Sequence, residues 1–285
     1  MKHLHIIIAK CFVAALLLLA PALAWAQKQI TILHTNDTHS CILPLKTNIT
    51  DTMTAGRGGF IRRIAMLKQE RAKDPQLLLF DSGDFSQGSA FYTLFHGDVE
   101  IGLMNQMHYD AGTIGNHEFD FGIDNMVRIF KKANFPILCS NYDLSATPLK
   151  DIVKPYTIIK RKGLKIGVFA LDPELKGLVS AKNYGPIVYE DPVSCAQKWA
   201  DFLKNKKHCD LVILISHLGW EEEGMGDQMV IANTRNIDLV LGGHSHTYFR
   251  DLRYVNNKDG KPVPDDQNGK NAVFVGKMQL TMSKK

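Results

Sequence analysis

Residues 30–39 read ITILHTNDTH, and this stretch decides how the chain can fold. The short, apolar and largely β-branched run 30–33 is typical of a strand that is covered on both faces. It leads directly into Asp37 and His39, two side chains of the kinds that bind metal ions. The sequence therefore predicts a buried strand whose carboxyl end carries candidate metal ligands.

Four further apolar runs end in polar side chains of the same kinds. Because the carboxyl ends of strands in an α/β sheet share one edge, we expect these five segments to converge there. A single Asp-x-His or His-x-His motif would more often be a turn or a surface pair. Five strands that all end in such residues are hard to explain by packing. The runs 77–80, 111–114, 211–215 and 238–241 are followed by Asp84, by Asn116 and His117, by His217, and by His244 and His246.

The rest of the chain predicts a largely parallel α/β architecture, because further strand-like runs alternate with amphipathic helices. The short loop between 156–159 and 165–170 predicts a hairpin, which makes the sheets mixed. The dipeptides Asp259-Gly260 and Asn268-Gly269 are turn signals, and 272–275 is strand-like. The other expected strand is 136–138, and the expected helices are 60–73, 98–107, 124–133, 192–206 and 226–233.

The first 26 residues differ from the rest and predict a secretory signal peptide. Lys2 and Lys10 precede the apolar stretch 11–20, and Ala24-Trp25-Ala26 has the small-x-small pattern of a cleavage site. The alternative is a membrane anchor, but the apolar run is too short to span a bilayer comfortably. We expect a secreted or periplasmic protein with no membrane attachment after cleavage, and one catalytic domain over residues 27–285.

Composition and charge exclude several classes of protein. The 285 residues are 45% apolar and 22% charged, which is ordinary for a globular protein. A net charge of +5 without a dense basic stripe argues against a nucleic-acid polymer as partner. The four cysteines that follow the expected signal peptide allow three disulfide pairings or free thiols, and the sequence does not choose among these. They are Cys41, Cys139, Cys195 and Cys209.

The candidate ligands suit two borderline-hard divalent ions. They comprise the imidazoles of four histidines, the carboxylates of Asp37 and Asp84, and the amide of Asn116. Thiolates are absent from the set, which argues against a structural zinc site. Mn, Zn, Fe and Co are all compatible with these donors.

These motifs, in this order, resemble those of the calcineurin-like metallophosphoesterases, and the longer strings resemble the 5′-nucleotidase branch. The resemblance covers nearly all of residues 28–280 and implies a four-layer α/β/β/α sandwich with two mixed sheets. The motifs are Asp37-x-His39, Gly83-Asp84, Gly115-Asn116-His117-Glu118, His217 and Gly243-His244-x-His246; the longer strings are 33–39, Gly58-Gly59-Phe60 and 115–120.

The resemblance implies two metal sites that share Asp84. A carboxylate suits the bridge because its two oxygens can serve two cations. Two divalent ions against two carboxylates leave a charge of about +2, which favours a phosphate anion, and the ions can activate a shared water for in-line attack. One ion would be held by Asp37, His39, Asp84 and His246, and the other by Asp84, Asn116, His217 and His244.

His117 resembles the catalytic histidine of the family, and Asp120 resembles its partner. Separated by three residues, they would meet if the segment turns helically. Asp120 would then orient the imidazole and favour its charged form. The alternative for Asp120 is a helix N-cap ahead of Asp124. His34 lies outside the ligand pattern of the family, and we expect Cys41 to be a packed thiol.

The resemblance implies a secreted, metal-dependent phosphoric ester hydrolase of the 5′-nucleotidase type, acting on a small phosphorylated substrate such as a nucleotide. Four alternatives stay open: a cyclic-nucleotide diesterase, a nucleotide-sugar hydrolase, a thiosulfate-handling relative, and a catalytically silent metal-binding interaction module. Full-length members of the branch continue into a second, nucleotide-binding domain, whereas this sequence ends at Lys285. We therefore expect either an open, self-sufficient site or a separate chain that supplies the nucleotide-binding half.

Overall fold

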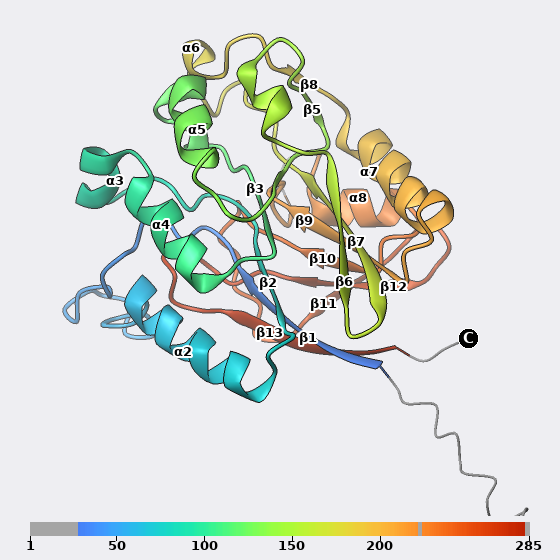
Figure 1. Cartoon of the computed structure of the whole chain (residues 1–285), viewed down its shortest axis with the longest axis horizontal. Helices are drawn as coiled ribbons and strands as arrows, with labels where there is room; N and C mark the ends of the chain where they lie inside the picture. Colours follow the sequence, from blue (N-terminus) through green and yellow to red (C-terminus); the bar gives the residue numbers. More distant parts are fainter. Residues whose placement is uncertain (1–27, 222–223, 283–285) are drawn as a thin grey trace, which may run out of the picture.

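The computed structural model describes residues 28–221 and 224–282, so the expected signal peptide lies outside the described residues. Two mixed sheets form the centre of the molecule, and helices cover their outer faces (Figure 1). Within the described ranges, no helix is both long and apolar enough to cross a bilayer.

The first sheet has five strands in the order β13-β1-β2-β3-β4. The four strands β1 to β4 are mutually parallel, and β13 (Gly276–Met282) runs antiparallel to β1 at the edge. Consequently the segments that follow β1, β2 and β3 all leave the sheet at one edge. These strands are β1 (Lys28–Thr35), β2 (Leu78–Asp81), β3 (Ala111–Thr113) and β4 (Ile137–Leu138).

The second sheet has six strands in the order β11-β12-β10-β9-β7-β6. Its four central strands are parallel, and the edge strands β6 and β11 are antiparallel to their neighbours. The predicted hairpin is confirmed as the β6–β7 pair. The strands are β6 (Tyr156–Arg161), β7 (Leu164–Leu171), β9 (Leu211–Ser216), β10 (Leu239–Leu241), β11 (Arg253–Asn256) and β12 (Pro262–Asp266); β5 (Tyr142–Asp143) and β8 (Val188–Tyr189) form a separate pair.

Three apolar clusters separate the layers. Side chains such as Ile32 and Phe80 of the first sheet pack against Ile213 and other side chains of the second sheet. The outer face of the first sheet packs under α2 (Phe60–Lys73), α4 (Asp98–Met107) and α5 (Gly122–Phe130). The outer face of the second packs under α7 (Pro192–Asp201) and α8 (Asp227–Asn233). The predicted four-layer sandwich with two mixed sheets is therefore confirmed (Figure 1).

Several predicted elements end or begin differently; the helix expected over 124–133, for example, is α5 at Gly122–Phe130. The helix expected over 192–206 ends as α7 at Asp201 and continues as a π-helical turn, η3 (Phe202–Lys206), because apolar spacing does not distinguish the two helix types. The strand expected at 272–275 is wrong: Ala272 has φ 57°, a left-handed turn conformation, and β13 begins only at Gly276. The turn that precedes it contacts the loop after β1, since the Asn271 amide donates to the Asp37 carbonyl.

The shorter elements complete the chain. Asp259-Gly260 lies in the turn between β11 and β12, as predicted, and Gly269 has φ 65° in the second predicted turn. The cysteines at 41, 139, 195 and 209 are all free thiols, so none of the three pairings forms among the described residues. The remaining elements are α3 (Ala90–Phe95), η1 (His117–Phe119), η2 (Pro148–Asp151) and α6 (Ala181–Tyr184).

Candidate metal centre

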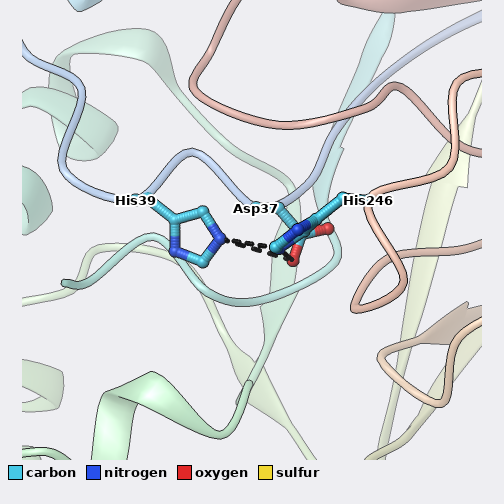
Figure 2. Close-up of side chains that lie close together, drawn as sticks. All are labelled: Asp37, His39 and His246. Carbon is cyan, nitrogen blue, oxygen red and sulfur yellow. Dashed lines mark hydrogen bonds and ion pairs between the residues drawn. The ribbon is translucent and has the colours of Figure 1, made fainter. Parts of the chain in front are cut away.

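The first group of candidate ligands joins the ends of the two sheets. Asp37 and His39 follow β1, and His246 follows β10, yet all three side chains point to one spot (Figure 2). His39 Nε2 lies 2.9 Å from His246 Nε2, and Asp37 Oδ1 lies 3.8 and 3.4 Å from these two nitrogens. One oxygen and two imidazole nitrogens thus converge as donors for one cation.

The second group combines Asp84, which follows β2, with His217 after β9 and His244 after β10. His217 Nε2 lies 3.2 Å from Asp84 Oδ2, and the rings of His217 and His244 are 5.0 Å apart. The ligand atoms of each group lie within 4.8 Å of one another. Each group therefore has one carboxylate and two imidazoles and draws on both sheets.

Hydrogen bonds between loops hold the two groups together. The Asp37 amide donates to the Gly83 carbonyl over 3.0 Å, and the His39 amide donates to the Asp84 carbonyl over 2.9 Å. Asp84 Oδ1 accepts from the His117 amide over 2.9 Å, so the Asp84 carboxylate also orders the start of η1. Asp84 consequently lies where the segments that follow β1, β2 and β3 meet.

The backbone at the site adopts conformations that ordinary residues rarely take. Left-handed φ angles at non-glycine residues cost free energy and cluster at functional sites. Five candidate ligands have them, and the interlocking loops hold each one in place. They are Asp37 (47°), His39 (42°), Asp84 (53°), His244 (70°) and His246 (56°).

Two buried polar atoms of the candidate ligands have no hydrogen-bond partner, and a metal ion would serve as that partner. Within the described chain, Asn116 Oδ1 and His217 Nε2 have no hydrogen-bond partner although both atoms are buried. An unsatisfied buried polar atom is costly. The His217 Nδ1–H donates to the Ser82 carbonyl over 2.6 Å, which leaves the Nε2 lone pair facing Asp84. A divalent cation would satisfy both atoms, so the residues fit a metal centre.

Electrostatics also favours a cation in the second group. Burial lowers the pKa of His217, but the Asp84 carboxylate outweighs burial and raises that pKa well above its usual value. A positive charge, either a proton or a metal ion, is thus stabilised between these two side chains. Burial and the nearby His217 lower the pKa of His244 to about 4, so His244 is neutral at pH 7, as a metal ligand must be.

His117 and Asp120 lie beside the groups as a hydrogen-bonded pair. Nδ1 of His117 is 3.2 Å from Asp120 Oδ1, and its ring is 5.5 Å from that of His39. Burial lowers the pKa of His117, but Asp120 and Asp84 outweigh burial and raise it above its usual value. The N-cap alternative for Asp120 is wrong, because α5 begins at Gly122 with Phe121 in the cap position.

The buried side chain of Glu118 supports the site, although the sequence alone indicated no role for it. Glu118 accepts from the amides of Asp84, Gly115 and Ser86 over 3.0, 2.6 and 3.0 Å. Burial and the Asp84 charge raise its pKa to about 8. Only its place within the 115–120 string could have pointed to it.

Behind Asp37, Asn36 Nδ2 donates to Asp37 Oδ2 over 2.6 Å. His34 lies in neither ligand group; its ring nitrogens contact Ser82 Oγ and the Asn268 amide, each at 2.9 Å. Cys41 is half-buried, and its thiol donates to the Leu43 carbonyl. The contacts of His34 were not predictable from pattern, because Ser82 and Asn268 are distant from it in sequence.

Comparison with known proteins now identifies the family. The sequence model of the family described as calcineurin-like phosphoesterase matches residues 30–248 of this chain. The chain belongs to the calcineurin-like phosphoesterase family. Members of this family hydrolyse phosphoric esters with a dinuclear divalent metal site, and the described part of this phosphoesterase has two groups of candidate ligands, around Asp37 and around Asp84.

Individual relatives of this phosphoesterase are 5′-nucleotidases. The human 5′-nucleotidase is 31% identical over 260 residues, covering 88% of this chain and 44% of that protein. The 5′-nucleotidase precursor of Thermus thermophilus superposes with a TM-score of 0.80 at 29% identity, covering 90% of this chain and 52% of that one. The NAD nucleotidase of Haemophilus influenzae gives 0.78 at 27% identity, covering 90% and 47%. The chain thus spans about half the length of these relatives.

Proposed function

We propose that this phosphoesterase hydrolyses phosphomonoesters of the 5′-nucleotidase type with two divalent metal ions. The observation that carries the proposal is the presence of two groups of candidate ligands at one edge of the sheets, around Asp37 and around Asp84, with the His117–Asp120 pair beside them. In this proposal Asp37, His39, Asp84 and His246 hold one ion, and Asp84, Asn116, His217 and His244 hold the other. When bound, the ions supply a water of lowered pKa and a positive field for the phosphate.

The side chains of the protein supply the remaining parts of the reaction. The raised pKa of His117 favours its protonated form, which would donate to a phosphoryl oxygen or to the leaving alkoxide. Asp120 would orient the imidazole through Nδ1 and leave Nε2 for the substrate. Asn36 and Glu118 would hold Asp37 and Asp84 in place through hydrogen bonds.

We further propose a nucleoside monophosphate as substrate and export from the cytoplasm. The relatives named 5′-nucleotidase, at about 30% identity, support the substrate. Residues 1–26 support export through their signal-peptide pattern. The N-terminal sequence of the protein isolated from its own cells tests export, since a mature chain that begins near Gln27 is expected and an uncleaved chain would contradict it.

Turnover on a substrate panel tests the reaction. Protein loaded with Mn²⁺ should release phosphate from p-nitrophenyl phosphate and from nucleoside monophosphates, and chelation should abolish this activity. Cyclic nucleotides and nucleotide sugars complete the panel, and a clear preference for either would select that alternative. A protein that binds two ions per chain and turns over none of these esters would be a silent binding module.

A further inference from the structure

A buried amide side chain, Gln267, contacts the loop that carries both metal-binding histidines. Gln267 follows β12 directly and is fully buried. Its Oε1 accepts hydrogen bonds from the Thr247 amide over 2.6 Å and from Ser245 Oγ over 2.9 Å. Its Nε2 donates to the Gly243 carbonyl over 2.8 Å. A single side chain therefore holds the loop at 243, 245 and 247.

These three contacts alternate with the two histidines in the sequence. His244 belongs to the group with Asp84, and His246 belongs to the group with Asp37. Both histidines have left-handed φ angles, so the loop needs outside contacts to hold its shape. Gln267 supplies a contact on each side of each histidine, and its own carbonyl accepts from the Phe249 amide over 2.9 Å.

We infer that Gln267 is a positioning residue that sets the geometry of both metal sites at once. An amide suits this role because it offers a donor and an acceptor within one planar group, one for the Gly243 carbonyl and one for the Thr247 amide. Groups that orient metal ligands from behind typically contribute about 10- to 100-fold to metal affinity. The inference rests on the assignment of His244 and His246 as ligands in the proposed function.

The test replaces Gln267 with methionine, which has similar length and no strong hydrogen-bonding group. The affinity for Co²⁺ is measured by competition with a chelator, together with the Co²⁺ absorption spectrum. We expect both ions of Gln267→Met to bind about 10- to 100-fold more weakly, with an altered spectrum. An affinity within about 3-fold of wild type and an unchanged spectrum would overturn the inference.

A matched control separates positioning from general stability. Asn105 also holds a loop from both sides, because its Nδ2 donates to the Lys132 carbonyl over 2.7 Å and its Oδ1 accepts from the Asn134 amide over 2.8 Å. Neither partner is near a candidate ligand in the sequence. Asn105→Leu should lower the melting temperature of the metal-free protein without changing Co²⁺ affinity. If Asn105→Leu weakens Co²⁺ binding as much as Gln267→Met does, the role of Gln267 is structural only.

A conservative variant covers the case in which Gln267→Met does not fold. Gln267→Glu keeps an oxygen for Thr247 and, when the new carboxyl is protonated, a donor for Gly243. The ratio of its Co²⁺ affinity to that of wild type should fall as pH rises and the carboxyl loses this proton, because two oxygens would then face each other. A ratio that stays constant with pH overturns the inference. A wild-type protein that binds fewer than two ions would instead refute the proposed function, and the inference with it.

Discussion

His39 and His246 face each other through their Nε2 atoms across 2.9 Å, at the point where the first and second sheets meet (Figure 2). Two imidazole nitrogens reach this distance in only two ways. One ring donates its N–H to the other, or both lone pairs point at a shared cation. Asp37 Oδ1, at 3.4 Å from His246 Nε2, favours the second arrangement in the metal-loaded protein because it adds a negative donor.

This relationship predicts that His39→Ala loses one ion and keeps the other. His39 belongs only to the group with Asp37 and His246, whereas Asp84, His217 and His244 form a separate group. Metal content after dialysis should fall from two ions to one per chain. The loss of both ions would mean that the sites assemble cooperatively, and the retention of both would remove His39 from the ligand set.

Asp84→Ala is predicted to lose both ions. The Asp84 carboxylate is fully buried, lies 3.2 Å from His217 Nε2, and is the proposed bridge between the two metals. Without it two cations would repel each other with no shared counter-charge. Asp98→Ala is a suitable control, since the Asp98 carboxylate pairs with Arg128 and Lys132 on the surface. Two tightly bound ions in the Asp84 variant would contradict the bridge.

His117→Asn is predicted to keep both metals and to lose activity by roughly 10²- to 10⁴-fold, the usual contribution of a positioned acid or base. The imidazole lies beside the ligand groups but belongs to neither. Metal content and kcat are measured on the same preparation. If the variant loses an ion, His117 is a ligand and its role as acid is wrong.

Hydrophobic pattern was enough to predict the sheets and the edge at which the site forms. The runs that became β1, β2, β9 and β10 are mainly apolar, and each ends in polar residues, so their common edge follows from α/β topology. The pairing of Asp37 with His246 does not follow from pattern, because the contact joins two sheets and spans most of the chain. Only the family resemblance predicted that grouping.

Strand β12 shows why other parts of the fold and of the site were not predicted from the sequence. Its sequence, PVPDD, has two prolines and two acids, and such residues favour turns over strands. Asp265 and Asp266 are nevertheless buried, and Asp265 is aligned with Val240 of β10. Because Gln267 follows this strand, its position behind the histidines was hidden as well. Buried polar contacts of this kind depend on the tertiary fold and leave no periodic signal.

Asp120→Asn is predicted to shift the pH dependence of activity toward acid. The Asp120 carboxylate raises the pKa of His117, so the protonated imidazole persists to higher pH in the wild-type protein. Without that charge the pKa falls, and the loss of kcat/KM with rising pH should begin at a lower pH. A basic limb that stays in place, or moves to higher pH, would show that Asp120 does not act on His117.

A glycine beside the shared carboxylate provides the most stringent test of the site geometry. A Cβ at Gly115 would lie 2.5 Å from the Asp84 amide nitrogen and still closer to Asp84 Oδ1. Neither group can withdraw, because Asp84 N donates to Glu118 Oε2 and Asp84 Oδ1 accepts from the His117 amide. We therefore expect Gly115→Ala to displace the Asp84 carboxylate and to abolish the binding of both ions.

The matched control for this substitution is Gly102→Ala in the exposed face of α4. A Cβ at Gly102 would meet nothing within 4 Å, and alanine favours a helix over glycine by about 0.5–1 kcal/mol. Gly102→Ala should therefore raise the melting temperature and leave metal binding unchanged. Circular dichroism measures the melting temperature of both variants, and metal analysis measures how many ions each one binds. If Gly115→Ala binds two ions with wild-type affinity, the Asp84 carboxylate is not confined as this geometry requires, and its assignment as the bridge fails.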